Sequence, residues 1–233
     1  MAPSSPHDAA AVAAFDLDGT LTEGGSVVHW LSAVAGRAPV RASIVRHGPA
    51  LIAGAIRSGS AADSAKESLF SSVLTGRDRA DVAAVSEQFA DEHLRTAVRP
   101  VVAARLGEHL DAGHLVVLVS ASPSLYVQRI AAAVGAHGCA ATDLGVDEHG
   151  MLTGRYEGRN CRGTEKLRKV RALLEELGAP VTGERRPLYA YGNSRGDLRL
   201  LSAADRPVDV SRLGRLGRLG RFPRLDEVAV EGA

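Results

Sequence analysis

The chain contains only two cysteines, Cys139 and Cys161, and no apolar run approaching the roughly 18 residues needed to cross a bilayer. Two cysteines without a charged-then-apolar leader at the N-terminus argue against a disulfide framework and predict a cytoplasmic protein. The net charge of +1 removes the electrostatic argument for a nucleic-acid partner. Lysine is also scarce, since Lys66, Lys166 and Lys169 are the only lysines among 28 basic residues. A lysine retained in so arginine-rich a chain is therefore a candidate for a specific role.

Hydrophobic residues make up 45% of the sequence, which is enough for one substantial core and a smaller accessory unit. Segments with the apolar character of buried strands lie at residues 11–15, 115–123, 138–142, 188–193 and 207–210. Helical spacing predicts helices over 124–135 and 164–177, and residues 145–158 have the pattern of a hairpin that turns near His149 and Gly150. The alternation of strands and helices predicts an α/β fold with a doubly wound parallel sheet.

The composition changes between residues 23 and 99, where Ala, Ser, Arg and Leu recur with helical spacing and no strand is evident. We predict about four helices in this stretch, inserted directly after the first strand. The predicted core therefore comprises residues 9–22 and 100–233, and the helical insert comprises residues 23–99.

The segment AVAAFDLDGTLT places Asp16 and Asp18 directly after the first predicted strand. Residues i and i+2 of an extended strand point the same way, so the two carboxylates are expected to project together from its carboxyl end. Open α/β sheets bind their ligands at that end. Two neighbouring negative charges at a buried edge need a cation, a proton or hydrogen-bond donors beside them. A divalent metal ion is the natural candidate.

This segment resembles the first motif of the haloacid dehalogenase-like (HAD) superfamily, whose phosphatase members use the first aspartate as a nucleophile. Later segments resemble the remaining motifs, with Ser120 ending the second strand, Lys166 in NCRGTEKL, and Asn193 and Asp197 in YAYGNSRGD. The resemblance covers nearly the whole chain and points to subfamily IB, the phosphoserine-phosphatase-like branch. It implies a Rossmann-like HAD core with an all-helical cap, inserted after the first strand, that excludes water and selects the substrate.

The resemblance also implies a role for each matching residue. Asp16 would attack phosphorus to give an aspartyl-phosphate, and Asp18 would protonate the leaving alcohol and then deprotonate the attacking water. Ser120 would donate to a phosphate oxygen, and Lys166 would neutralise the charge that builds up during transfer. The backbone N–H of Gly19 is expected to donate to another phosphate oxygen. The predicted phosphate-binding residues are Gly19, Thr20 and Ser122.

A Mg²⁺ cofactor is implied as well, although the fourth motif departs from the family pattern. Asn193 stands where the pattern usually has a metal-binding Asp, whereas Asp197 keeps the second acidic position. An amide oxygen can still ligate Mg²⁺, but the loss of one negative charge predicts weaker binding. The predicted metal site consists of Asp16, Asp18 through its backbone carbonyl, Asn193, and Asp197 as the residue that orients the ligands.

The predicted function is Mg²⁺-dependent hydrolysis of a phosphomonoester, either a small organic phosphate or a lipid head-group phosphate. Phosphoserine phosphatases of this branch carry a Glu nine residues after the nucleophile, where this chain has Gly25, so phosphoserine is disfavoured. Several apolar residues of the insert fit either an acyl chain or ordinary packing, and we favour packing. These residues are Trp30, Ile44, Leu51 and Ile56.

Three alternatives stay open at this point: a non-catalytic phosphate-binding or regulatory protein, which Asn193 suggests, a phosphoserine phosphatase, and a phosphotransferase that passes the phosphoryl group to another alcohol. The Leu-Gly-Arg repeat of residues 211–224 is compatible with peripheral contact with an anionic membrane. Its glycines, however, disfavour a stable amphipathic helix and favour a solvated edge.

Overall fold

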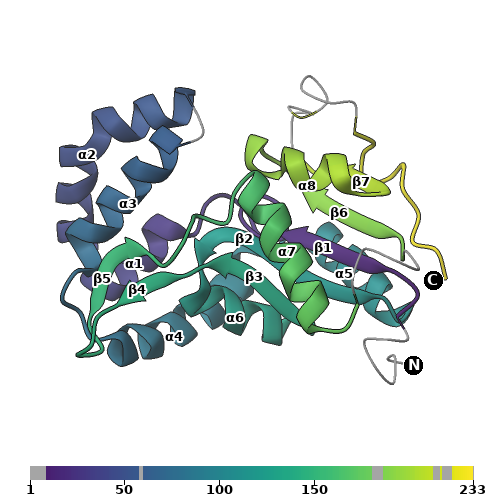
Figure 1. The fold of residues 1–233 in the computed structure, drawn as a ribbon, viewed down its shortest axis with the longest axis horizontal. Helices are drawn as coiled ribbons and strands as arrows, with labels where there is room; N and C mark the ends of the chain where they lie inside the picture. The colour runs from purple at the N-terminus through teal and green to yellow at the C-terminus, as the bar shows by residue number, and fades with distance from the viewer. Residues whose placement is uncertain (1–8, 58–59, 180–185, 212–215, 217–221, 233) are drawn as a thin grey trace.

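The computed structural model describes residues 9–57, 60–179, 186–211, 216 and 222–232, with the backbone alone for residues 49–57 and 60. Five parallel strands form its main sheet: β1 (Val12–Asp16), β2 (Leu115–Pro123), β3 (Gly138–Thr142), β6 (Leu188–Gly192) and β7 (Arg206–Asp209). Their order in space is β3-β2-β1-β6-β7, so β1 is central (Figure 1). The predicted α/β fold with a parallel sheet is confirmed.

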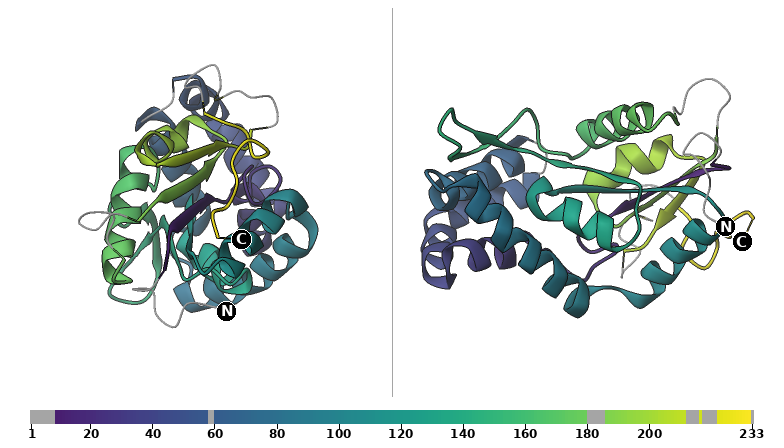
Figure 2. Two further views of the ribbon diagram at one scale, coloured as in Figure 1. Left: turned by 90° about the vertical axis from the view of Figure 1, so that its right-hand side faces the viewer. Right: turned by 90° about the horizontal axis from the view of Figure 1, so that it is seen from below.

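Helices cover both faces of this sheet (Figure 2). They are α5 (Pro100–Asp111), α6 (Ser124–Ala133), α7 (Thr164–Glu176) and α8 (Leu198–Ala203). Ala13 and Phe15 of β1 belong to the hydrophobic core that includes α5 and α6, whereas Val12 and Ala14 belong to the core that includes α7 and α8. Burial on both faces explains the continuous apolar runs of β1 up to Phe15 and of β2 up to Val119.

Four helices occupy the insertion between β1 and α5, namely α1 (Val27–Ala35), α2 (Arg37–Arg57), α3 (Ser60–Leu74) and α4 (Arg79–Ala97). Figure 1 shows them gathered beyond the carboxyl ends of the strands, which confirms a helical insertion after β1. The two connections to the core run side by side, because the N–H of Glu23 donates to the carbonyl of Ala97 at 2.7 Å and that of Arg99 donates to Leu21 at 2.9 Å. The chain therefore leaves and re-enters the core at one place.

The predicted hairpin is present as β4 (Leu144–Val146) and β5 (Leu152–Tyr156), and it packs on α3 rather than on the main sheet. Gly154 has a φ of +70°, and an added Cβ would lie 2.5 Å from the Cα of Ser71, so this close approach requires glycine. The hydroxyl of Tyr156 donates to the carbonyl of Asp63 at 3.2 Å. The hairpin thus links the second half of the chain to the helical insert.

Among the described residues, no helix is long and apolar enough to span a bilayer. Trp30 is fully buried and its indole N–H donates to Oγ of Ser86 at 2.8 Å, which supports packing as the role of this residue. Ile44 is partly buried. The side chains of Leu51 and Ile56 lie outside the described residues, as do residues 212–215 and 217–221 of the Leu-Gly-Arg repeat.

Candidate active site

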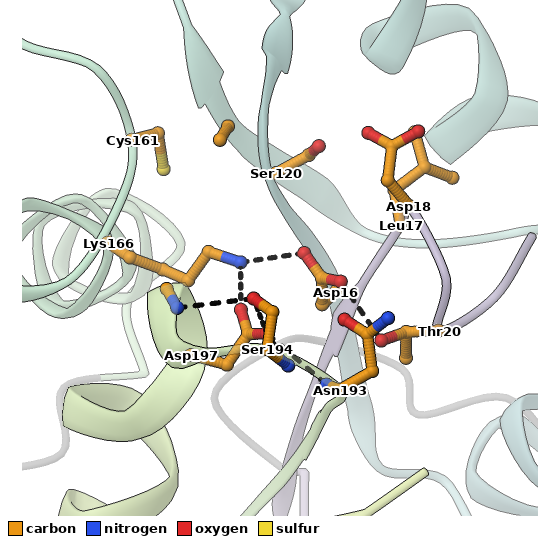
Figure 3. A network of polar contacts seen from close by, with 12 residues as sticks. Asp16, Leu17, Asp18, Thr20, Ser120, Cys161, Lys166, Asn193, Ser194 and Asp197 are labelled. Carbon is orange, nitrogen blue, oxygen red and sulfur yellow. Dashed lines mark hydrogen bonds and ion pairs between the residues drawn. The ribbon is translucent and has the colours of Figure 1, made fainter. Parts of the chain in front are cut away.

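The carboxyl ends of three adjacent strands bring together polar residues that are far apart in sequence. Asp16 is the last residue of β1 and pairs in register with Val119, so Ser120 lies one residue beyond that level on β2. Asn193 directly follows β6 on the other side of β1. Figure 3 shows these residues and Lys166 arranged around the end of β1. The site therefore lies where open α/β sheets bind ligands.

Asp16 lies in a buried cluster of charges. It is 6% exposed, its Oδ1 accepts from Nζ of Lys166 at 2.7 Å, and its Oδ2 accepts from Oγ1 of Thr20 at 2.9 Å. The Lys166 ammonium also donates to Oδ1 of Asp197. Two carboxylates thus share one ammonium, which leaves one net negative charge when all three are ionised.

Burial and the charge of Asp197 raise the pKa of Asp16 to about 7, although the Lys166 ammonium acts in the opposite direction. Burial alone would lower the pKa of Lys166, but Asp16 and Asp197 hold it above its usual value. The lysine is therefore protonated at neutral pH. A second cation beside Asp16 would favour the ionised carboxylate, because an opposite charge within a few ångströms stabilises the charged form.

Helix α7 places Lys166 against the sheet. Lys166, Val170 and Leu174 are spaced four residues apart, lie on one face of the helix and are all buried. Lys169 lies on another face, where its Nζ donates to Ala141 and pairs with the half-exposed Asp143 at 2.7 Å. Helical spacing thus distinguishes the buried lysine from the peripheral one.

Asn193 supplies an oxygen without a partner. Its Oδ1 is buried and has no hydrogen-bond donor in the described structure, and Figure 3 shows it on the side that faces Asp16. Leaving a buried carbonyl unsatisfied costs about 1–3 kcal/mol, so a ligand that fills this position gains correspondingly. Amide and carboxylate oxygens are the donors that Mg²⁺ takes. The residues present therefore fit this ion.

No three His, Cys, Asp or Glu side chains converge as a metal site within the part of the chain that the structure describes. Both oxygens of Asp197 are engaged, Oδ1 by Lys166 and Oδ2 by the N–H and hydroxyl of Ser194 at 2.9 and 2.8 Å and the N–H of Asn193 at 3.2 Å. This arrangement favours a role for Asp197 in orienting Lys166 and Asn193, and it disfavours a role as a direct metal ligand.

Asp18 does not project beside Asp16 as strand alternation predicts. Strand β1 ends at Asp16, so Asp18 belongs to the turn that follows and its side chain is free of the alternation rule. Its Oδ1 accepts from the N–H of Ser26 at 2.6 Å, and its Oδ2 accepts from the hydroxyl of Ser122 at 2.5 Å. The two carboxylates therefore have separate sets of partners, and Asp18 is held on the side of the helical insert.

The absence of a side chain at Gly19 makes room for the Asn193 side chain, and the Gly19 backbone does not present its N–H to a phosphate. From the sequence, its N–H was predicted to donate to a phosphate oxygen. In the structure it donates to the carbonyl of Thr22 at 2.8 Å. Its φ is +79°, and an added Cβ would lie 2.0 Å from Nδ2 of Asn193. Glycine is required here so that the Asn193 amide can lie against the turn after β1.

The hydroxyls predicted to bind phosphate also have protein partners. Thr20 donates to Asp16 and Ser122 donates to Asp18, so both position the two carboxylates instead. Oγ of Ser120 accepts from the N–H of Ser122 at 3.0 Å. A hydroxyl that accepts in this way keeps its own hydrogen to donate, so Ser120 remains available to a phosphate oxygen.

Arg99 supports the site and was not identified from sequence. Its Nη1 donates to the carbonyls of Gly19, Thr20 and Val210 at 2.8, 3.1 and 3.1 Å, which fixes the turn after β1 against the end of β7. The available signal was its position directly before Pro100, where the chain returns from the insert to the core.

Comparison with known proteins agrees with this geometry. The model of the haloacid dehalogenase-like hydrolases matches residues 13–202. Phosphoserine phosphatase SerB1 of Mycobacterium tuberculosis is 29% identical over 211 residues, which cover 88% of this chain and 66% of that protein, just under two thirds of its length. Protein CicA of Caulobacter vibrioides is 32% identical over 194 residues, 82% of each chain.

A solved structure of similar shape is the protein of unknown function from Bordetella pertussis Tohama I. It superposes with a TM-score of 0.77 at 28% identity, over 94% of this chain and 100% of that chain. The family match, the sheet order and the position of the insert agree with one another, so the resemblance seen in the sequence is confirmed. The chain belongs to the haloacid dehalogenase-like hydrolase family.

Proposed function

We propose that this hydrolase is a Mg²⁺-dependent phosphomonoesterase that acts through an aspartyl-phosphate on Asp16. The observation that carries the proposal is the buried Asp16 carboxylate at the end of β1, with the Lys166 ammonium at 2.7 Å and an unsatisfied Asn193 oxygen on its side of the site. The similarity to SerB1, named a phosphoserine phosphatase, supports a phosphate ester as the substrate class. A small organic phosphate or a lipid head-group phosphate fits this class.

In the first step Asp16 uses a carboxylate oxygen to attack phosphorus, and the bond from phosphorus to the leaving oxygen breaks. Lys166 offsets the negative charge that gathers on the transferred group, and Asp197 keeps that ammonium in place. Asp16, Asn193 and the Asp18 carbonyl would hold Mg²⁺, which would supply positive charge that favours the ionised nucleophile and offsets the charge of the phosphate. Ser120 donates its hydroxyl hydrogen to a phosphate oxygen.

Asp18 handles the protons in both steps. It gives a proton to the departing alcohol oxygen and then takes one from the water that attacks the aspartyl-phosphate. The N–H of Ser26 and the hydroxyl of Ser122 hold its carboxylate in one orientation, and these donors come from the insert side and from β2. A fixed proton carrier separate from the nucleophile is what a double displacement needs.

We further propose that residues 23–99 form a cap over this site, and that residues 9–22 and 100–233 form the catalytic core. Helices α1–α4 lie beyond the carboxyl ends of the strands, where the site is. Ser26 reaches Asp18 directly from the start of the insert. A cytoplasmic location is part of the same proposal, and the free thiols of Cys139 and Cys161 support it.

Turnover of p-nitrophenyl phosphate, measured with and without Mg²⁺, tests the assignment. Asp16→Asn should lower kcat at least about 1,000-fold, because the nucleophile is lost. Asp91→Asn is the matched control, since this side chain is 53% exposed and pairs with Arg129 on the surface, and its effect should stay within about twofold. Equal activity of the two variants would rule out Asp16 as the nucleophile. Inactivity of the wild type, with activity restored by Asn193→Asp, would favour the non-catalytic alternative.

A further inference from the structure

Lys66 has no role in the fold or in the proposed chemistry described so far, yet it reaches the site. It lies on α3 of the insert, and its Nζ donates at 2.7 Å to the carbonyl of Ala121, between Ser120 and Ser122. The same Nζ lies 5.5 Å from the ring centroid of Phe70. A cation from the insert is therefore held against the strand end that is expected to bind phosphate.

This ammonium has no carboxylate partner among the residues that the structure describes. The other two lysines of the chain, Lys166 and Lys169, each form an ion pair with at least one carboxylate. Lys66 is partly buried, and its hydrogen-bond acceptor is a neutral carbonyl. A desolvated cation without a counter-charge is costly, so its presence points to an anion that binds beside it.

The acidic groups nearest to Lys66 are already held by other donors. Burial lowers the pKa of Lys66 to about 8, and the charges of Asp18 and Asp63 oppose that effect. Asp18 accepts from its two serine donors, and Oδ1 of Asp63 accepts from Nδ2 of Asn160 at 2.6 Å. Both carboxylates influence Lys66 from a distance without pairing with it.

Lys66 is placed on the side of the leaving group. Lys66 donates to the carbonyl of Ala121, and the next residue, Ser122, donates its hydroxyl hydrogen to Asp18, the proposed proton donor to the departing oxygen. The nucleophile Asp16 has its own lysine, which approaches from α7 on the core side. An anion that binds Lys66 is therefore expected on the alcohol that departs, and not on the phosphoryl group that is transferred.

We infer that Lys66 binds a negatively charged group on the leaving alcohol, so that the site prefers phosphomonoesters whose leaving group carries a carboxylate or a second phosphate. This inference rests on the proposed phosphatase activity. The acidic neighbours of Lys66 on α3, Asp63 and Glu67, are held by Asn160 and by the N–H of Tyr156. Each uses one carboxylate oxygen in that contact. The ammonium of zwitterionic serine would be repelled by the Lys66 ammonium, so a net-negative leaving group is favoured over serine.

Three substrates test this preference. Glycerol 3-phosphate has a neutral leaving group, 3-phosphoglycerate adds a carboxylate, and 1,3-propanediol bisphosphate adds a second phosphate. The measured quantity is the ratio of kcat/KM for each anionic substrate to that for glycerol 3-phosphate. We expect a ratio of about 10 or more for at least one anionic substrate, as one charge-assisted hydrogen bond supplies. For O-phosphoserine, measured as a fourth substrate, kcat/KM should be lower than for 3-phosphoglycerate.

Variants of Lys66 assign the preference to its charge. Lys66→Met should bring the ratio close to one, Lys66→Arg should keep most of it, and Lys169→Met should leave it at the wild-type value. A ratio that Lys66→Met does not change would overturn the inference and leave the phosphatase proposal intact. An equal loss on all three substrates would assign Lys66 to the transferred phosphoryl group and would overturn it as well.

Binding separates this inference from the proposed function. If no phosphomonoester is hydrolysed, the phosphatase proposal fails, and calorimetric titration of the Asp16→Asn variant still tests Lys66. That variant should bind 3-phosphoglycerate about tenfold more tightly than glycerol 3-phosphate, and the difference should disappear in Asp16→Asn/Lys66→Met. Equal binding of the two ligands by Asp16→Asn would contradict the role of Lys66.

Discussion

Replacement of Lys166 by Met should lower the free energy of unfolding by an amount that follows from the contacts of the ammonium group. The ammonium lies between Asp16 and Asp197, and all three side chains are at most 8% exposed. The variant keeps an unbranched side chain, one heavy atom shorter, but leaves two buried carboxylates without their shared cation. Removal of one partner from a buried ion pair costs about 3–5 kcal/mol. We expect the free energy of unfolding to fall by that amount at about pH 8.

Lys169→Met is the matched control, because it makes the same change one helical turn away on α7. Its partner Asp143 is 46% exposed, and ion pairs of that kind contribute about 0–1 kcal/mol. Urea unfolding followed by circular dichroism measures both costs. Equal costs for Lys166→Met and Lys169→Met would refute the description of Lys166 as the counter-ion of a buried pair.

The cost of Lys166→Met should also depend on pH. Burial and Asp197 raise the pKa of Asp16 to about 7 even with the lysine present, and loss of the lysine raises it further. An acid whose folded pKa lies above its unfolded value of 3.8 binds more protons in the folded state between those two values. Stability therefore falls as pH rises through that window in wild type and variant alike. The deficit of the variant changes only above it, where Asp16 is ionised in the wild type and still protonated in the variant, so the deficit should grow from about pH 7 to about pH 9. A deficit independent of pH would contradict the charge argument.

Three further predictions follow from single contacts. Gly19→Ala should lower the melting temperature more than Gly24→Ala, because both glycines have positive φ but only the first would press a Cβ against Asn193, at 2.0 Å. Asn193→Asp should lower the Mg²⁺ concentration needed for half-maximal activity several-fold, since it restores a negative ligand; an unchanged Mg²⁺ dependence would remove Asn193 from the metal site. Burial lowers the pKa of His109 to about 3, so the unfolded chain binds more protons as pH falls from 6.5, and stability should decline by up to about 5 kcal/mol across that window. Urea unfolding at several pH values checks this, and His109→Gln should flatten the profile.

The parallel strands could be predicted because burial on both faces leaves a local signature, a continuous apolar run such as that of β1. The position of the site could be predicted from the same signature, because the carboxyl ends of neighbouring parallel strands lie at one edge of the sheet. The face of α7 that carries Lys166 was also readable, because Val170 and Leu174 continue its spacing at intervals of four residues. These features depend on short stretches of chain.

Features that depend on distant contacts could not be predicted in the same way. The orientation of Asp18 depends on where β1 ends and on Ser122, which lies 104 residues further along the chain. The sequence predicted a phosphate contact for the Gly19 N–H, because nothing local indicates that the carbonyl of Thr22 accepts it. Lys66 stood out only as one of few lysines, and its contact with Ala121 arises from the way α3 packs against the core.

Asp16 as the acceptor of the phosphoryl group is tested most directly by acid-quenching the enzyme during turnover of a radiolabelled phosphomonoester and locating the label by proteolysis and mass spectrometry. The label should be released by hydroxylamine, as an acyl phosphate is, and should lie on the peptide that contains Asp16. It should be absent from Asp16→Asn. Label on another residue, or label that persists in Asp16→Asn, would contradict the proposed chemistry at the end of β1.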